Sequence, residues 1–318
     1  MAPRRPLGKK LFKSLLPILL VLAVALIIAL GFIVYGVTRP CRRPYLVTPQ
    51  SFTGISGRVL KVTDETWQNR DGTRARGWLL KGGEGAPAVV FLHKYCGDRS
   101  LLFNLGIKLN ETTNFTILWP DLRGHGIDPP TSSTTFGNRE AEDLLAALDF
   151  LRTVRGDSDS QLVGDRVGVY GVELGAYAAL RAANKDPRIQ ALALDSVPAD
   201  ADELLNAAVR EDVGINSTVL LKLSRMATHI YYLGVFENTS SCELAQGLKT
   251  QRVLLMAGAE AESLRQSTVA LQSCFANPAN LEVKTDLPLT GFTLPSATGE
   301  QGERYDRPVI EFFLKSLQ

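Results

Sequence analysis

The sequence has little histidine, little cysteine and no excess of charge of either sign. Its 318 residues include three histidines and four cysteines, and the formal net charge is only +2. This balance argues against nucleic acid as a partner, because nucleic-acid-binding domains normally carry a concentrated basic patch. Four cysteines do not make a disulfide scaffold in a chain of this length, although Cys242 and Cys274 would be able to pair in an oxidising compartment.

Motifs for cofactors are also missing. The sequence has no Gly-x-Gly-x-x-Gly run after a strand pattern and no phosphate-binding loop, and no group of residues has a standard metal-ligand spacing. We therefore expect neither a cofactor nor a metal. With 45% hydrophobic and 21% charged residues, the chain is long enough for one large globular domain or two small ones.

One long hydrophobic run is present near the N-terminus. No charged residue occurs between Lys13 and Arg39, and the apolar run 15–37 is long enough to cross a bilayer. A cleaved secretory signal has a shorter apolar region, followed by small residues at a cleavage site. We predict a basic tail (1–14), a retained transmembrane helix (15–37), a linker (38–55) and a globular domain (56–318).

The cations around this run predict its orientation. Five lysines and arginines precede the run, and three arginines follow it closely. Lys and Arg are in excess on the cytoplasmic side of membrane-spanning helices. We therefore expect a single-pass membrane protein whose globular domain lies on the non-cytoplasmic side.

The globular part alternates strand patterns with helix patterns. Short, continuously apolar runs are typical of strands buried on both faces of a parallel sheet, and they occur at 86–94, at the start of 115–126, and at 166–171, 189–196 and 252–258. Helical patterns occur at 99–111, 138–154 and 173–184, and the segments 57–65 and 74–82 predict an antiparallel hairpin. This order predicts an α/β fold with a mainly parallel sheet and helices on both faces.

The segment between the last two of these strands is unusually long. Residues 197–251 exceed an ordinary connection between a strand and its neighbour. We assign them to a helical lid, because insertions that shape the substrate site usually occur at this position in this topology.

Three motifs resemble landmarks of the α/β-hydrolase family, and they occur in the order expected for it. "FLHKYCGDRS" (91–100) resembles the His-Gly-rich loop after the third strand, and "PDLRGHG" (120–126) resembles the loop after the fourth. "GVELG" (171–175) resembles the Gly-x-Ser-x-Gly nucleophile elbow. The resemblance covers about residues 56 to 318, and it implies the fold of esterases, lipases and related peptidases.

Glutamate stands where this family has its nucleophilic serine. Gly171 and Gly175 keep the small flanks of the elbow, and Glu173 occupies the reactive position. An ionised carboxylate has no hydroxyl proton to give to a base, although related folds use an aspartate to attack carbon electrophiles. The resemblance further implies an oxyanion loop formed by Lys94, Tyr95 and Leu174.

The histidine of the family's catalytic triad is missing as well. It should follow the acid near the C-terminus, but no histidine follows His229, and "TGF" in the loop 286–300 stands where a Gly-His pair is expected. Glu260 and Glu262 lie about where the family places its acid, and Asp195 ends the preceding strand pattern. Without a histidine to orient, we interpret these acids as solvated loop residues with no triad role.

The remaining reactive side chains suggest alternative sites. Five of them lie at the C-terminal ends of strands, where open α/β sheets bind ligands: His93, Cys96, Asp121, His125 and Glu173. They would be able to form a metal site, a His93–Glu173 dyad, or a Cys96 nucleophile with His93 as its base. We favour scaffolding histidines and a small buried cysteine.

Two functional hypotheses follow. The joint loss of serine and histidine removes both attack and proton transfer, which favours a membrane-anchored protein of this fold that binds a small molecule or a protein. The alternative is an active hydrolase of ester, peptide or related bonds, with Glu173 as nucleophile or general base. A relocated histidine, His93 or His125, would then assist Glu173.

Overall fold

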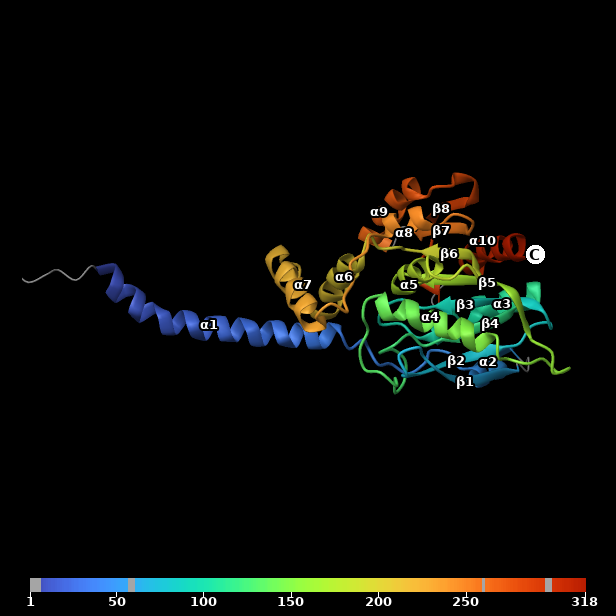
Figure 1. The fold of residues 1–318 in the computed structure, drawn as a ribbon, viewed down its shortest axis with the longest axis horizontal. Helices are drawn as coiled ribbons and strands as arrows, with labels where there is room; N and C mark the ends of the chain where they lie inside the picture. The colour runs from blue at the N-terminus through green and yellow to red at the C-terminus, as the bar shows by residue number, and fades with distance from the viewer. Residues whose placement is uncertain (1–6, 57–60, 259–260, 295–298) are drawn as a thin grey trace, which may run out of the picture.

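One eight-stranded sheet organises the chain (Figure 1). The computed structural model describes residues 7–56, 61–258, 261–294 and 299–318. The strands are β1 (Val62–Gln68), β2 (Arg74–Leu80), β3 (Ala86–Leu92), β4 (Thr116–Pro120), β5 (Val163–Val172), β6 (Ile189–Asp195), β7 (Arg252–Gly258) and β8 (Leu281–Leu287). Their order is β1-β2-β4-β3-β5-β6-β7-β8, antiparallel at β1–β2 and β2–β4 and parallel elsewhere. The predicted hairpin and mainly parallel sheet are therefore present.

Helices cover both faces of this sheet. The α-helices are α1 (Leu7–Val37), α2 (Pro49–Ser56), α3 (Phe103–Thr113), α4 (Asn138–Leu151), α5 (Leu174–Ala183), α6 (Ala201–Val213), α7 (Thr218–Tyr232), α8 (Ser241–Gly247), α9 (Glu262–Leu271) and α10 (Gly299–Leu317). Short 3-10 helices are η1 (Arg99–Leu102), η3 (Gln272–Cys274) and η4 (Pro278–Asn280). The long segment after β6 contains α6, α7 and α8, as expected for a helical insertion.

Strand β3 shows how the sequence makes both faces of the sheet apolar. Successive side chains of a strand point to opposite faces, so Ala88, Val90 and Leu92 pack with α4 and α5. Val89 and Phe91 pack on the other face with α3 and α10. Fully burying a large aliphatic or aromatic side chain contributes about 1.5–3 kcal/mol, which explains why a continuously apolar run indicates a central strand.

The segment expected to be a linker contains a helix, α2. Thr48 precedes this helix, and its hydroxyl oxygen accepts the backbone N–H of Ser51 at 3.1 Å. Pro49 occupies the first helical position, where its fixed φ fits and its missing N–H is harmless. This Thr-Pro start signal was available in the sequence, but the interpretation as linker overlooked it.

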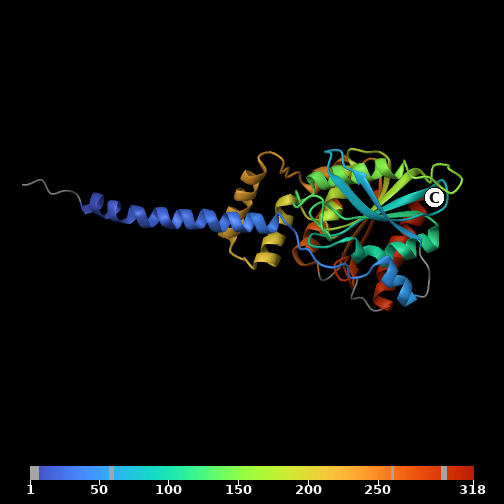
Figure 2. The same ribbon diagram turned by 90° about the horizontal axis from the view of Figure 1, so that it is seen from below.

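Helix α1 leaves the sheet domain as a long, separate helix (Figures 1 and 2). Among the described residues, its segment Leu15–Val37 is the one stretch that is long and apolar enough to cross a membrane. Most of this segment is exposed, but Val34 and Val37 are buried, because α6 and α7 pack against the last turns. The Tyr95 hydroxyl also donates a hydrogen bond to the Val37 carbonyl oxygen at 2.8 Å. The end of α1 is therefore part of the folded domain.

All four cysteines form disulfides. Cys242 and Cys274 join α8 to η3, with their Cα atoms 5.2 Å apart, as the sequence analysis allowed. Cys41 and Cys96 join the chain after α1 to the loop after β3, with their Cα atoms 4.8 Å apart. The second bond was not expected from the sequence.

The Cys242–Cys274 bond should contribute strongly to stability. It links residues 32 positions apart, and closing a loop of this length in the unfolded chain is worth about 3–4 kcal/mol. We expect the Cys242→Ser/Cys274→Ser variant of the full chain to lose about this much free energy of unfolding in urea titrations. With dithiothreitol present, wild type and variant should become equally stable. An unchanged midpoint without reductant would contradict this expectation.

Candidate functional site at the turn after β5

A sharp turn of one residue, Glu173, joins β5 to α5. Its backbone has φ 52° and ψ −106°, and a positive φ is unfavourable for a residue with a Cβ. The surrounding packing leaves room only for glycine at two positions. A Cβ on Gly171 would lie 2.6 Å from the Gly175 backbone, and one on Gly175 would lie 2.3 Å from the Leu92 carbonyl oxygen. These close approaches hold the turn in its strained conformation.

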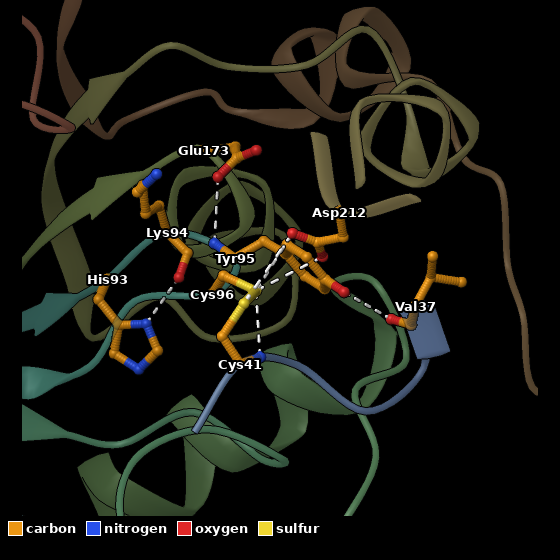
Figure 3. Close-up of a disulfide and its surroundings, with 8 residues drawn as sticks. All are labelled: Val37, Cys41, His93, Lys94, Tyr95, Cys96, Glu173 and Asp212. Atoms are coloured by element: carbon orange, nitrogen blue, oxygen red, sulfur yellow. Dashed lines mark hydrogen bonds between the residues drawn. A yellow bond between two sulfur atoms is a disulfide. The ribbon is translucent and has the colours of Figure 1, made fainter. Parts of the chain in front are cut away.

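The Glu173 side chain is bonded to the loop after β3 (Figure 3). Its Oε2 accepts the backbone N–H of Tyr95 at 3.1 Å, and only 5% of the residue is exposed. Burial raises the pKa of the Glu173 carboxyl to about 7, although the nearby Lys94 ammonium opposes the rise. Glu211 in α6 adds a further, smaller increase to this pKa. The carboxyl group is therefore near its titration point at neutral pH.

His93 does not form the dyad with Glu173 that the sequence allowed. Its Nε2 accepts the backbone N–H of Leu122 at 3.0 Å, so the ring proton is on Nδ1, which donates to the Lys94 carbonyl oxygen at 2.8 Å. Figure 3 shows the ring lying apart from the Glu173 carboxylate. Burial lowers the pKa of His93, which favours the neutral imidazole. His93 therefore orders the loops after β3 and β4.

The other two histidines are engaged elsewhere. His125 contacts the Arg123 carbonyl oxygen through Nδ1 at 2.9 Å, and burial lowers the pKa of its imidazole well below the usual value. His229 in α7 contacts the Asp202 carboxylate through Nε2 at 2.7 Å and packs against Phe236, 4.4 Å between ring centroids. In the part of the chain that the structure describes, no histidine hydrogen bonds to Glu173.

The expectation of a free Cys96 thiol is wrong, because Cys96 is bonded to Cys41. A disulfide sulfur has neither a proton nor a thiolate charge, so Cys96 cannot serve as a nucleophile or as a thiolate metal ligand in this state. Asp121, which was also considered as a metal ligand, accepts a hydrogen bond from the Tyr45 hydroxyl at 2.6 Å and forms an ion pair with Arg99. The centroids of the His93 and His125 rings are 5.0 Å apart, but no three of the five described residues considered for a metal site bring their ligand atoms together.

A fully buried carboxylate, Asp195, lies at the end of β6, and its interpretation as a solvated loop acid is wrong. Its Oδ2 accepts the Gly291 N–H at 2.7 Å and also the Tyr305 hydroxyl, while Oδ1 accepts the Ser196 hydroxyl at 2.7 Å. Burial raises the pKa of Asp195 to about 6, and these hydrogen bonds oppose the rise. The sequence signal for this burial was the position of Asp195 at the end of an apolar strand.

The two other acids considered for the catalytic triad are Glu260 and Glu262. Glu260 lies outside the described residues, and Glu262 is described only as the first residue of α9.

The loop after β8 brings "TGF" to this region. A Cβ on Gly291 would lie 2.4 Å from the Val172 side chain, one residue before the turn. The Lys94 ammonium lies 4.8 Å from the centre of the Phe292 ring. The backbone N–H of Glu173 also bonds to the Asp195 carbonyl oxygen at 2.9 Å. The turn, the buried acid and the loop expected to carry a histidine thus lie together.

Comparison with known proteins agrees with this arrangement. The sequence profile of the alpha/beta hydrolase family matches residues 89–296, more than half of the chain. The chain belongs to the alpha/beta hydrolase family. Among solved structures of this fold, an esterase of Pyrococcus furiosus matches with a TM-score of 0.65 and 18% identity, over 88% of this chain and 100% of that one. The alpha/beta hydrolase GrgF of Penicillium matches with a TM-score of 0.59 and 16% identity, over 81% and 99%.

A curated relative in this comparison is an uncharacterized 31.7 kDa protein of Escherichia coli from the traX-finO intergenic region. It is 21% identical over 168 residues, 53% of this chain and 56% of its own length. The chain thus matches little more than half of that relative. At these identities, the alpha/beta hydrolase likeness establishes the fold and leaves the chemistry to the site residues.

The raised pKa of Glu173 has a measurable effect on stability. The folded value of about 7 exceeds the ordinary 4.5, so folding takes up a proton between these pH values and stability falls as the pH rises. The penalty is complete above pH 7 and absent below about pH 4.5. We expect the free energy of unfolding of Glu173→Gln to exceed that of wild type by about 3 kcal/mol at pH 8 and by less than about 1 kcal/mol at pH 5.

Thermal melting of both proteins at the two pH values measures this difference. Glu311→Gln, on the exposed surface of α10, is the matched control and should leave the stability unchanged at both pH values. Equal stabilisation by Glu173→Gln at pH 5 and pH 8 would show that charge burial is not its cause.

Proposed function

We propose that this chain is a membrane-anchored alpha/beta hydrolase homologue that does not hydrolyse esters and acts by binding a small molecule or a protein. The hydrogen bond from the Tyr95 N–H to Glu173 Oε2 carries the proposal. In serine hydrolases of this fold, an N–H from the loop after the third strand helps to bind the oxyanion. Here that donor is already bonded to a carboxylate of the protein, at the position inferred for the nucleophile.

Among the described residues, no histidine is placed at the inferred site to transfer protons to or from Glu173. Phe292 stands where we expected the histidine, and the pKa of both His93 and His125 is lowered by burial among backbone partners. Asp195 remains buried, but the Tyr305 hydroxyl and the Gly291 N–H donate to its carboxylate the hydrogen bonds that an imidazole N–H would otherwise donate. These replacements support a non-catalytic role, because the Tyr95 N–H and the Asp195 carboxylate are already hydrogen bonded within the protein.

The enzymatic alternative rests on one observation. A carboxyl group whose pKa lies near 7 suits general acid-base catalysis at neutral pH. However, Glu173 is only 5% exposed, and a substrate would have to displace its bond to Tyr95. The binding proposal is therefore the better supported of the two.

A pair of variants distinguishes a site that has lost its serine and histidine from one that catalyses through Glu173. We expect wild type to show no hydrolysis of short acyl esters and no labelling by a fluorophosphonate, which reacts with activated serines. Glu173→Ser/Phe292→His restores a hydroxyl and an imidazole, so its labelling rate should exceed that of Glu173→Ser, the matched control, by roughly tenfold or more.

Two results would count against the proposal. Turnover of an ester, epoxide, halide or peptide by wild type that is lost in Glu173→Ala would support the enzymatic alternative. A folded double variant with no labelling would contradict the assignment of these two positions.

We further propose that α1 crosses a membrane and that the domain lies on its non-cytoplasmic side. The excess of cations before residues 15–37 supports this orientation. The two disulfides also support it, because such bonds persist in oxidising compartments and are rare in the cytosol.

The redox state of the cysteines in cells tests this orientation. After acid quenching and denaturation without reductant, a maleimide-polyethylene glycol reagent should add to none of the four cysteines. Addition after reduction is the positive control. Four additions without reduction would place the domain in a reducing compartment.

A further inference from the structure

Helix α7 presents an apolar stripe to the outside of the domain. The exposed fractions are 68% for Val219, 55% for Met226 and 62% for Ile230 within the helix, and 84% for Leu233, the residue that caps its C-terminus. The intervals of seven and four residues between Val219, Met226 and Ile230 place these three side chains on one face of the helix. The opposite face is buried against the domain through Leu221, Ser224 and Thr228. Soluble domains rarely expose a contiguous apolar surface of this kind without a partner.

The position of α7 relative to α1 indicates what covers this stripe. Both α6 and α7 pack against α1, whose buried residues Val34 and Val37 lie within the apolar segment Leu15–Val37. In Figures 1 and 2, α6 and α7 lie between the sheet and the exposed length of α1. Tyr35 and Arg39, stacked 3.8 Å apart, mark the end of α1 with the residue types typical of the headgroup layer. If α1 spans a bilayer, helix α7 lies at the level where α1 enters it.

The charges of α7 also fit a membrane surface. The helix contains Lys222, Arg225 and His229 but no acidic residue. Arg225 and His229 face α6, where both contact Asp202, whereas Lys222 is exposed between the apolar side chains of the stripe. A lysine in this position can lay its alkyl chain along apolar surface while its ammonium group reaches lipid phosphates. Anionic lipids would be favoured over neutral ones.

We propose that α7 lies in the interfacial layer of the bilayer that α1 crosses. The stripe from Val219 to Leu233 would contact acyl chains, and Lys222 would contact the phosphates. The inference rests on the proposed function only in that α1 must span the membrane. The two helices α1 and α7 would then both contact the membrane and hold the domain in one orientation on it.

Tryptophan quenching in vesicles tests this inference with the full chain. Ile230→Trp places the probe in the stripe, Leu22→Trp places it in α1, and Val269→Trp is a control on the exposed surface of α9. Each protein is reconstituted in phosphatidylcholine vesicles with a minority of phosphatidylglycerol, with and without brominated acyl chains. After subtraction of the wild-type signal, the emission at positions 230 and 22 should fall roughly twofold in brominated vesicles, and that at 269 should stay unchanged.

The outcomes separate this inference from the anchoring on which it depends. Quenching at position 22 but not at 230 would overturn the inference and leave α1 as a membrane anchor. Emission at 230 that is shielded from water but not quenched would mean that a second copy of the chain covers the stripe, which also overturns it. Absence of quenching at both positions would refute the anchoring and the inference together.

Discussion

The hydrogen bond between the Tyr95 N–H and Glu173 joins the candidate site to the loop that also holds the end of α1. Tyr95 bonds through its backbone to the turn after β5 and through its hydroxyl to the last residue of α1. The next residue, Cys96, is covalently bonded to Cys41, just beyond α1. Two consecutive residues thus join the candidate site to the apolar helix and to the segment that follows it. A displacement of the end of α1 relative to the sheet would disturb the bond to Glu173.

The turn itself depends on packing rather than on the side chain at position 173. Gly171 and Gly175 allow the close approach of β3 and α5, and the Glu173 backbone bonds to Asp195 and Tyr177. None of these interactions needs a serine. A buried glutamate does need compensation, because an unpaired carboxylate in an apolar site is very unfavourable. The Tyr95 N–H and the raised pKa of Glu173 provide that compensation.

The sequence predicted most of the fold because the central strands are apolar on both faces, as Val89 and Val90 of β3 illustrate. It predicted less of the site, because pairings between distant residues leave no local pattern. Nothing around Cys41 indicates that its partner lies 55 residues later. The role of Asp195 likewise depends on Gly291 and Tyr305, which only the folded sheet brings to it.

Helix α6 links α1 and α7 to the candidate site. It packs against α1 and α7, and its last turn carries Asp212, whose carboxylate lies 3.5 Å from the Cys96 sulfur. Glu211 in the same turn raises the pKa of Glu173, so it lies close enough for charge repulsion. A ligand that reached the Glu173 carboxylate from this side would separate α6 from the loop after β3. Because α6 also contacts α1, such a ligand would act on a helix that packs against the end of α1.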